Sequence, residues 1–279
     1  MENIENINEI PLDLIDIYKS KVDEGKELWK DKKVVICGLA RNCENKIDSC
    51  IDRIRTLAKY FSEYKIIVFE NNSTDQTKEK LNNYSDIINI GKDDSEDFSN
   101  GFSERRVVRL SRYRDCIQNY IKNKYSNYDY VIVVDFDITD WAVDGIITSL
   151  AWDKDFDVMG SFSQVYHPTL QSGDGWIHYD RWAFKFHSWT EEWSEKQGSD
   201  MRWFWYWKPP IGAKPIPCLS VFGGLAIYKM EPYLIGKYGY KHPEQLDGCI
   251  TSEHNQFHYT LHNSGYNKIY LNPSQRCII

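Results

Sequence analysis

The chain has 279 residues, 42% of them hydrophobic and 15% aromatic, which is enough for one substantial core and excludes a mainly disordered protein. Its net charge of −7 excludes a protein whose main role is to bind nucleic acid or an anionic membrane, since both need a basic surface. No apolar run reaches about eighteen residues, and the seven cysteines form no CxxC pair, so we expect reduced thiols, no transmembrane segment and a cytoplasmic protein, at most peripheral to a membrane.

The first half of the chain has the pattern of a parallel sheet with crossover helices. Residues 1–31 form an N-terminal extension with one predicted helix, and from residue 32 short apolar runs alternate with helical periodicity. The predicted elements are, in chain order, a helix at 11–29, strands at 34–37 and 66–69 with a helix at 47–61 between them, a helix capped by Ser73, Thr74 or Asp75 and ending near 81, a strand at 87–90, a helix at 104–124 and a strand at 128–134.

The pattern changes near residue 145. Beyond it we predict strands at 158–162 and 219–227, a tryptophan-dense stretch, and a helix at about 251–264. The sequence therefore predicts an α/β fold in which residues 32–145 and 146–279 are two halves fused into one domain.

Two acidic residues directly follow the strand predicted at 128–134. Asp135 and Asp137 alternate along the chain, so both carboxylates can meet at one point if the chain turns there. A hard divalent cation such as Mn²⁺ or Mg²⁺ takes one or two protein carboxylates and completes its shell with diphosphate oxygens. We interpret the pair as such a site; an acidic helix cap is the alternative interpretation of the motif taken alone.

The loops after the first and second strands meet at the same edge of an open α/β sheet, where ligands bind. Small residues in these loops allow close approach, an arginine can contact phosphate, and Glu or Asn side chains can hydrogen-bond a base or a ribose. A turn that caps the next helix is the competing interpretation of the second loop. The nucleotide-binding candidates here are Ala40, Arg41, Asn42, Glu70 and Asn72, together with Asp135 and Phe136 of the acidic motif.

The helix at 104–124 carries five of the eleven arginines of the chain. Arg109 and Arg112 are one helical step apart and are expected to share a face that clamps a diphosphate, with Arg114 pointing elsewhere. A solvated basic face is the equally weighted alternative, and RNA binding is disfavoured by the overall charge.

Seven of the ten tryptophans lie between residues 176 and 207. Aromatic faces suit the C–H faces of sugars, although most of these rings are expected to belong to the core. The candidates for contact with the acceptor or the donor sugar are Trp176, Tyr179, Asp180 and Trp182.

A late helix start supplies the acid–base candidates. Glu253 is the first choice for the general base that takes a proton from an acceptor hydroxyl, and Asp247 is the reserve. His258 is a candidate third metal ligand or an ordinary packed histidine. The spacing of His254 and His258 does not form the HExxH motif of zinc hydrolases.

Three segments together resemble the GT-A glycosyltransferases: Ala-Arg-Asn at 40–42, Glu-Asn-Asn-Ser-Thr-Asp-Gln-Thr at 70–77 and Val-Val-Asp-Phe-Asp at 133–137. The likeness covers roughly residues 33–140. The stretches at 109–115 and 179–183 resemble, more loosely, the fungal capsule-associated mannosyltransferases and related bacterial and viral enzymes, which often have Arg-Asn where this chain has Arg114-Asp115. The resemblance implies nucleotide contacts at the first two loops, a metal at the acidic motif and an acceptor side in the second half.

We therefore expect a metal-dependent glycosyltransferase that transfers a sugar, with inversion, from a UDP- or GDP-linked donor to a glycan or glycoconjugate acceptor. Residues 32–145 would bind the nucleotide-sugar and residues 146–279 the acceptor. Two alternatives stay open at this point: a nucleotidyltransferase of related fold, which would release pyrophosphate, and a non-catalytic carbohydrate-binding protein.

Overall fold

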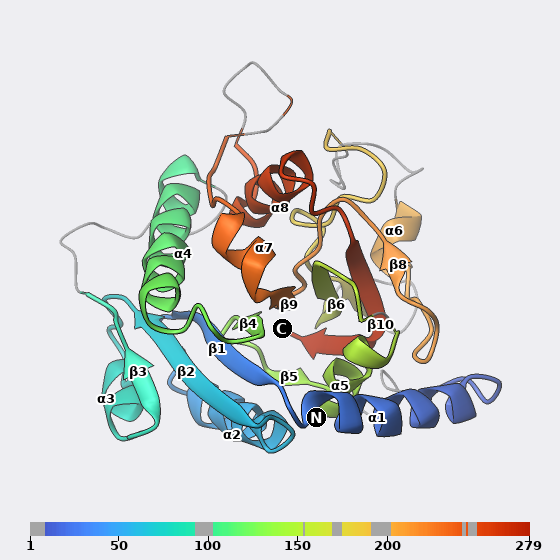
Figure 1. The fold of residues 1–279 in the computed structure, drawn as a ribbon. Coiled ribbons are helices and arrows are strands. Elements are labelled where there is room, and N and C mark those ends of the chain that lie inside the picture. The colour runs from blue at the N-terminus through green and yellow to red at the C-terminus, as the bar shows by residue number, and fades with distance from the viewer. Residues whose placement is uncertain are drawn as a thin grey trace.

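The protein forms one mixed sheet with helices on both of its faces (Figure 1). The computed structural model describes residues 9–92, 103–152, 154–168, 175–190, 202–241, 244 and 250–279. Within these described residues, ten strands lie in the sheet, eight of them in the order β3-β2-β1-β4-β9-β6-β10-β5, while β7 pairs with β6 and β8 with β10. No described helix is long and apolar enough to cross a membrane.

The first half of the sheet is parallel, as predicted. Strand β1 pairs in parallel with β2 on one side and β4 on the other, and β2 pairs in parallel with β3. The elements of this half are α1 Ile15–Trp29, β1 Lys33–Ala40, α2 Ile47–Ala58, β2 Glu63–Glu70, α3 Thr77–Asn82, β3 Ile87–Asn89, α4 Glu104–Lys124, β4 Tyr130–Val134, β5 Asp140–Trp141 and α5 Val143–Trp152. The bounds of α4 coincide with the predicted helix.

The second half continues the sheet with antiparallel neighbours. Strand β9 runs antiparallel to both β4 and β6, and β10 pairs in parallel with β6 across a bulge between Asn272 and Arg276. The elements are β6 Val158–Tyr166, β7 Trp176–His178, α6 Arg202–Tyr206, β8 Ile216–Pro217, β9 Leu225–Lys229, α7 Met230–Ile235, α8 Glu253–Asn263 and β10 Ile269–Ile278. The predicted α/β class is confirmed by this architecture.

Alternating residues of β1 divide the core into two layers. Val34 and Ile36 pack in a cluster with residues of α1, α2 and α5, whereas Val35 and Cys37 face a second cluster with residues of α4, α7 and α8. All four side chains are at most 1% exposed. A strand buried on both faces reads as a continuous apolar run, which is why the sequence reveals it.

Two predicted strands are wrong at their start: β4 begins at Tyr130 and not at residue 128, and the error at β9 is larger. The prediction began a strand at residue 219, but β9 begins only at Leu225. Gly223 and Gly224 have φ angles of 66° and 78°, a left-handed backbone that no strand accommodates, so the chain turns there before β9.

Candidate active site

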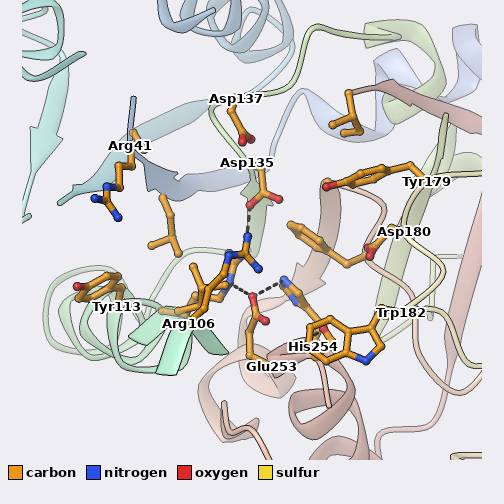
Figure 2. Close-up of a pocket in the computed structure, with 18 of the residues that line it drawn as sticks. Arg41, Arg106, Tyr113, Asp135, Asp137, Tyr179, Asp180, Trp182, Glu253 and His254 are labelled. Carbon is orange, nitrogen blue, oxygen red and sulfur yellow. Dashed lines mark hydrogen bonds and ion pairs between the residues drawn. The ribbon is translucent and has the colours of Figure 1, made fainter. Parts of the chain in front are cut away.

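A cavity of about 1240 Å³ lies where the carboxyl ends of β1, β2 and β4 face α4 and the start of α8 (Figure 2). Its walls come from both halves of the chain. The loops after β1 and β4 contribute one side, and residues 179–182 and the first turn of α8 contribute the opposite side. The edge of the sheet at which the sequence predicts ligand binding is therefore covered by residues from the second half of the chain, which form the opposite wall of the cavity.

The acidic motif opens onto this cavity. Asp135 and Asp137 both line it, whereas Phe136 between them is fully buried in the core. Burial raises the pKa of the Asp135 carboxyl to about 7, with Arg114 opposing that shift and the charge of Asp137 adding to it. Because the charge of Asp137 disfavours ionisation of Asp135, a cation shared by the two carboxylates would stabilise the charged pair, so the pair fits a divalent metal.

Arg114 contacts the acidic motif from the middle of α4. Its Nη2 donates to Oδ1 of Asp135 at 3.0 Å, and its Nε donates to Oε1 of Glu253 at 2.9 Å. The side chains of Arg114 and Glu253 are 5% and 6% exposed, while that of Asp135 is 32% exposed. Arg114 points away from Arg109 and Arg112, as the sequence predicts, and this direction leads to the acidic motif.

A different face of α4 meets the cavity than the one predicted. Arg106 and Arg114 line it, at positions i and i+8, together with Leu110 and Tyr113. Of the predicted pair, Arg109 is buried and Arg112 is exposed, and neither belongs to the cavity lining. The predicted shared face is therefore wrong: the rotation of the helix against the sheet buries Arg109, leaves Arg112 exposed and turns Arg106 and Arg114 to the cavity.

The loop after β1 reaches the cavity as expected. Ala40, Arg41 and Asn42 all line it. Asn42 has a φ of 48°, and its Oδ1 accepts from the backbone N–H of Thr74 at 2.8 Å. The backbone N–H of Asn42 in turn donates to Ser73 Oγ at 3.1 Å. Asn42 therefore also ties the loops after β1 and β2 together.

In the loop after β2, the residue that reaches the cavity is Asn71. Its Oδ1 accepts from the hydroxyl of Tyr113 at 2.9 Å, and both residues line the cavity. The predicted Glu70 is 1% exposed and its Oε1 accepts from Ser73 N at 2.8 Å, and Asn72, with a φ of 46°, also lies outside the lining. Glu70 thus shapes the turn after β2 instead of lining the cavity, contrary to its prediction as a nucleotide contact.

The aromatic stretch contributes three of its four candidates. Tyr179, Asp180 and Trp182 line the cavity, and Tyr179 is 46% exposed. Asp180 Oδ2 accepts from the backbone N–H of Gly223 at 2.8 Å, and burial raises its pKa to about 6. Trp176 lies outside the lining and packs edge-on against Tyr166.

Among the other described rings of the aromatic stretch, Phe184, Trp189 and Phe204 are buried, whereas Trp205 also lines the cavity. Phe184 and Phe204 stack with ring centroids 5.4 Å apart, and Trp207 stacks on Phe204 at 5.7 Å. These rings pack as core residues, but the tryptophans of the stretch divide between core and cavity wall: Trp189 is buried, while Trp182 and Trp205 line the cavity.

The start of α8 brings Glu253 and His254 to the cavity. The His254 ring stacks on Phe222 with a centroid distance of 3.7 Å, and its Nε2 lies 3.6 Å from Oε1 of Glu253. Burial, followed by the charge of Arg114, lowers the pKa of His254 well below its usual value, so the ring is neutral. The reserve base, Asp247, lies outside the described residues.

His258 does not reach the cavity, contrary to its prediction as a metal ligand. Its Nδ1 is 2.7 Å from Ser220 Oγ and its Nε2 is 3.2 Å from the Tyr228 hydroxyl, so both ring nitrogens have protein partners. The ring is one turn further along α8 than His254 and packs in the core. Within the described part of the chain, no three His, Cys, Asp or Glu side chains gather into a group that could hold a metal ion.

No protein-family model matches the chain, and no curated protein sequence matches it. Several solved structures are similar in fold. Residues 1–349 of TarS from Staphylococcus aureus align with 15% identity over 88% of this chain and 59% of that chain, with a TM-score of 0.43. The mannosyltransferase PcManGT from Pyrobaculum calidifontis, in complex with GDP-Man and Mn²⁺, aligns with 13% identity over 99% and 68% of the two chains, with a TM-score of 0.47.

Glucosyl-3-phosphoglycerate synthase from Mycobacterium tuberculosis aligns with 14% identity over 92% of this chain and 75% of that chain, with a TM-score of 0.48. Of the TarS fragment, this chain spans 59%, which is less than two thirds of its length.

Proposed function

We propose that this protein is a GT-A-type glycosyltransferase that transfers a sugar from a UDP- or GDP-linked donor to a hydroxyl of a glycan or glycoconjugate, with inversion at the anomeric carbon. One observation carries the proposal. Within a single cavity, the acidic pair Asp135 and Asp137 and the cations Arg41 and Arg106 face the carboxylate of Glu253 and the aromatic wall at Tyr179 and Trp182 (Figure 2).

The two sides of the cavity suit the two halves of such a reaction. Arg41 and Arg106 provide positive charge for a diphosphate. A nucleoside would lie against the end of the cavity that Asn71 and the stacked rings of Phe69 and Tyr113 line. On the opposite side, Trp182 provides a ring face for a sugar. A cavity of about 1240 Å³ has room for both substrates together.

Asp135 and Asp137 would hold a divalent cation, Mn²⁺ or Mg²⁺, which when bound supplies charge neutralisation for the departing diphosphate. The structure fits such an ion because the two carboxylates share the cavity and Asp137 raises the pKa of Asp135. Arg106 would stabilise the same developing charge through its guanidinium.

The chemical step would be a direct displacement. The acceptor hydroxyl oxygen forms a bond to the anomeric carbon, the bond between that carbon and the diphosphate oxygen breaks, and the hydroxyl proton moves to Glu253. Glu253 suits this role because it lines the cavity on the side opposite to the acidic motif's loop. Proton removal by a positioned carboxylate contributes typically 10²–10⁴-fold to rate.

Nucleotide binding and donor turnover test the proposal. Thermal shifts with UDP, GDP and their sugar conjugates, each with and without Mn²⁺, should show stabilisation by one nucleotide class that depends on the metal. Release of free nucleotide from the stabilising donor would then be measured for the wild type and for Glu253→Gln, which should bind the donor normally and turn it over at least about 100-fold more slowly.

Two outcomes would assign the cavity otherwise. Release of pyrophosphate from a nucleoside triphosphate and a sugar phosphate would make the protein a nucleotidyltransferase. Glycan binding without any response to nucleotide or metal would make it a non-catalytic binding protein. Full donor turnover by Glu253→Gln would move the base to another residue, with Asp247 tested next.

A further inference from the structure

One buried guanidinium connects the two acidic positions of the cavity. Arg114 donates through Nε to Glu253 and through Nη2 to Asp135, at 2.9 and 3.0 Å. The carboxylate of Glu253 is almost as buried as the guanidinium that it accepts from. Hydrogen bonds between buried charges are short and directional, so they restrict the Glu253 carboxylate more than a surface ion pair would.

The two oxygens of Glu253 have different surroundings. Oε1 accepts from Arg114 and faces Nε2 of His254 at 3.6 Å. The His254 ring and the Arg114 guanidinium both lie on Phe222, with centroid distances of 3.7 and 5.2 Å, so this edge of the site is tightly packed. None of the described residues donates a hydrogen bond to Oε2, which leaves this oxygen for a ligand.

We infer that Arg114 is a positioning residue that acts through Glu253: by holding Oε1, it presents Oε2 to the acceptor hydroxyl. The inference rests on the proposed function, in which Glu253 takes the proton. The O–H bond of the acceptor breaks as its oxygen bonds to the anomeric carbon, and the proton bonds to Oε2, so Glu253 ends the step as a neutral carboxylic acid. Arg114 itself does not contact the reacting atoms.

The planar guanidinium of Arg114 can donate to two carboxylates at the same time. Nε and Nη2 reach two different carboxylates at once, and a lysine would carry the same charge on a single nitrogen at the end of a flexible chain. Arg114→Lys should therefore keep the charge balance of the cavity but lose the fixed orientation of Glu253. This separates positioning from a purely electrostatic contribution.

The test is a double-mutant cycle of Arg114→Gln and Glu253→Gln, with Arg114→Lys as the conservative variant. The matched control is Arg112→Gln, which removes an exposed arginine of the same helix that does not line the cavity. The rate of nucleotide release from the donor found by thermal shift gives kcat and KM for each protein.

Arg114→Gln should lower kcat about 100-fold, with a smaller effect on KM, and Arg114→Lys should recover part of the loss. In the Glu253→Gln background, adding Arg114→Gln should lower kcat by less than about a further threefold, because the carboxylate that Arg114 positions is already absent. If the loss of kcat in the double variant equalled the product of the losses in the two single variants, the inference would be overturned. An Arg114→Gln protein with the kcat of the Arg112→Gln control would overturn it as well.

A second measurement does not depend on turnover. Urea midpoints of the wild type and the three variants of the cycle report whether Arg114 and Glu253 are coupled in the folded protein. Non-additive midpoints support the contact, and additive ones refute it. If the wild type turns over no donor, the proposed function fails and the positioning role with it, while the unfolding cycle still decides whether the contact exists.

Discussion

Gly38 of β1 sets how closely the strand that carries the acidic motif can approach its neighbour. A Cβ placed on Gly38 would lie 1.7 Å from the carbonyl oxygen of Val134, the residue directly before Asp135, and 3.1 Å from Cδ2 of Phe136. The nearest atom is backbone and cannot rotate away. We therefore expect Gly38→Ala to force β1 and β4 apart at the cavity end of the sheet.

The size of the effect follows from this geometry. An ordinary contact between carbon and oxygen needs more than 3 Å, so the strands would have to separate there by roughly 1.5 Å. Overpacking in a well-packed core costs typically about 1–3 kcal/mol, and a backbone obstacle belongs at the upper end. With a slope near 3 kcal/mol per molar urea for a chain of this size, a loss of about 3 kcal/mol lowers the urea midpoint by about 1 M.

Urea unfolding followed by tryptophan fluorescence measures this loss. A thermal-shift titration with Mn²⁺ and the preferred nucleotide measures the accompanying displacement of Asp135. Gly239→Ala is the control, because its new Cβ would approach only the side chain of Gln256, at 2.7 Å from Cγ, which can move. A Gly38→Ala protein as stable as the wild type and equally responsive to Mn²⁺ and nucleotide would refute the close approach of the strands.

Three further predictions concern charged residues of the cavity. Asp137→Asn should abolish the Mn²⁺ dependence of nucleotide stabilisation without lowering the melting temperature of the free protein, and an unchanged Mn²⁺ response would contradict the metal assignment. Arg106→Gln should weaken nucleoside diphosphate binding about tenfold in a calorimetric titration, whereas Arg112→Gln should leave it unchanged; equal effects would contradict the observed face of α4. Because burial raises the pKa of Asp180 from 3.8 to about 6, the folded state binds a proton that the unfolded chain has released, so the free energy of unfolding falls as pH rises through this range. Asp180→Asn should flatten that slope in urea unfolding measured at several pH values between about 4 and 7, and an unchanged slope would show that Asp180 is not its source.

The elements nearest to the cavity differ in how far sequence alone predicts them. The run at 34–37 is apolar at every position because β1 is buried on both faces, and the periodicity of α4 extends over 21 residues. Both signals are local, so both elements are predicted correctly. Strand β10, by contrast, contains Pro273 and a bulge between Asn272 and Arg276, and its polar residues are buried, so no alternating pattern reveals it.

The same division applies to the side chains. Asp135 and Asp137 are found from sequence because they follow directly on a buried strand, and Tyr179, Asp180 and Trp182 because they form a compact polar and aromatic group. For His258 the sequence leaves a metal ligand and a packed histidine as alternatives, because both of its hydrogen-bond partners, Ser220 and Tyr228, come from other parts of the chain.

The sequence by itself determines a parallel β-α half ending in an acidic pair, because burial on both strand faces and helical periodicity are written in neighbouring residues. Only the tertiary structure decides that Arg106 and Arg114, rather than Arg109 and Arg112, face the cavity, and that Arg114 holds Glu253, 139 residues away in the chain. The rotation of α4 is set by the packing of Val107, Ile117 and Ile121 into the protein interior, and the position of Glu253 by an α8 that reaches this edge through long-range contacts. Side-chain packing between distant elements thus selects which residues line the cavity from several that the local pattern leaves equivalent.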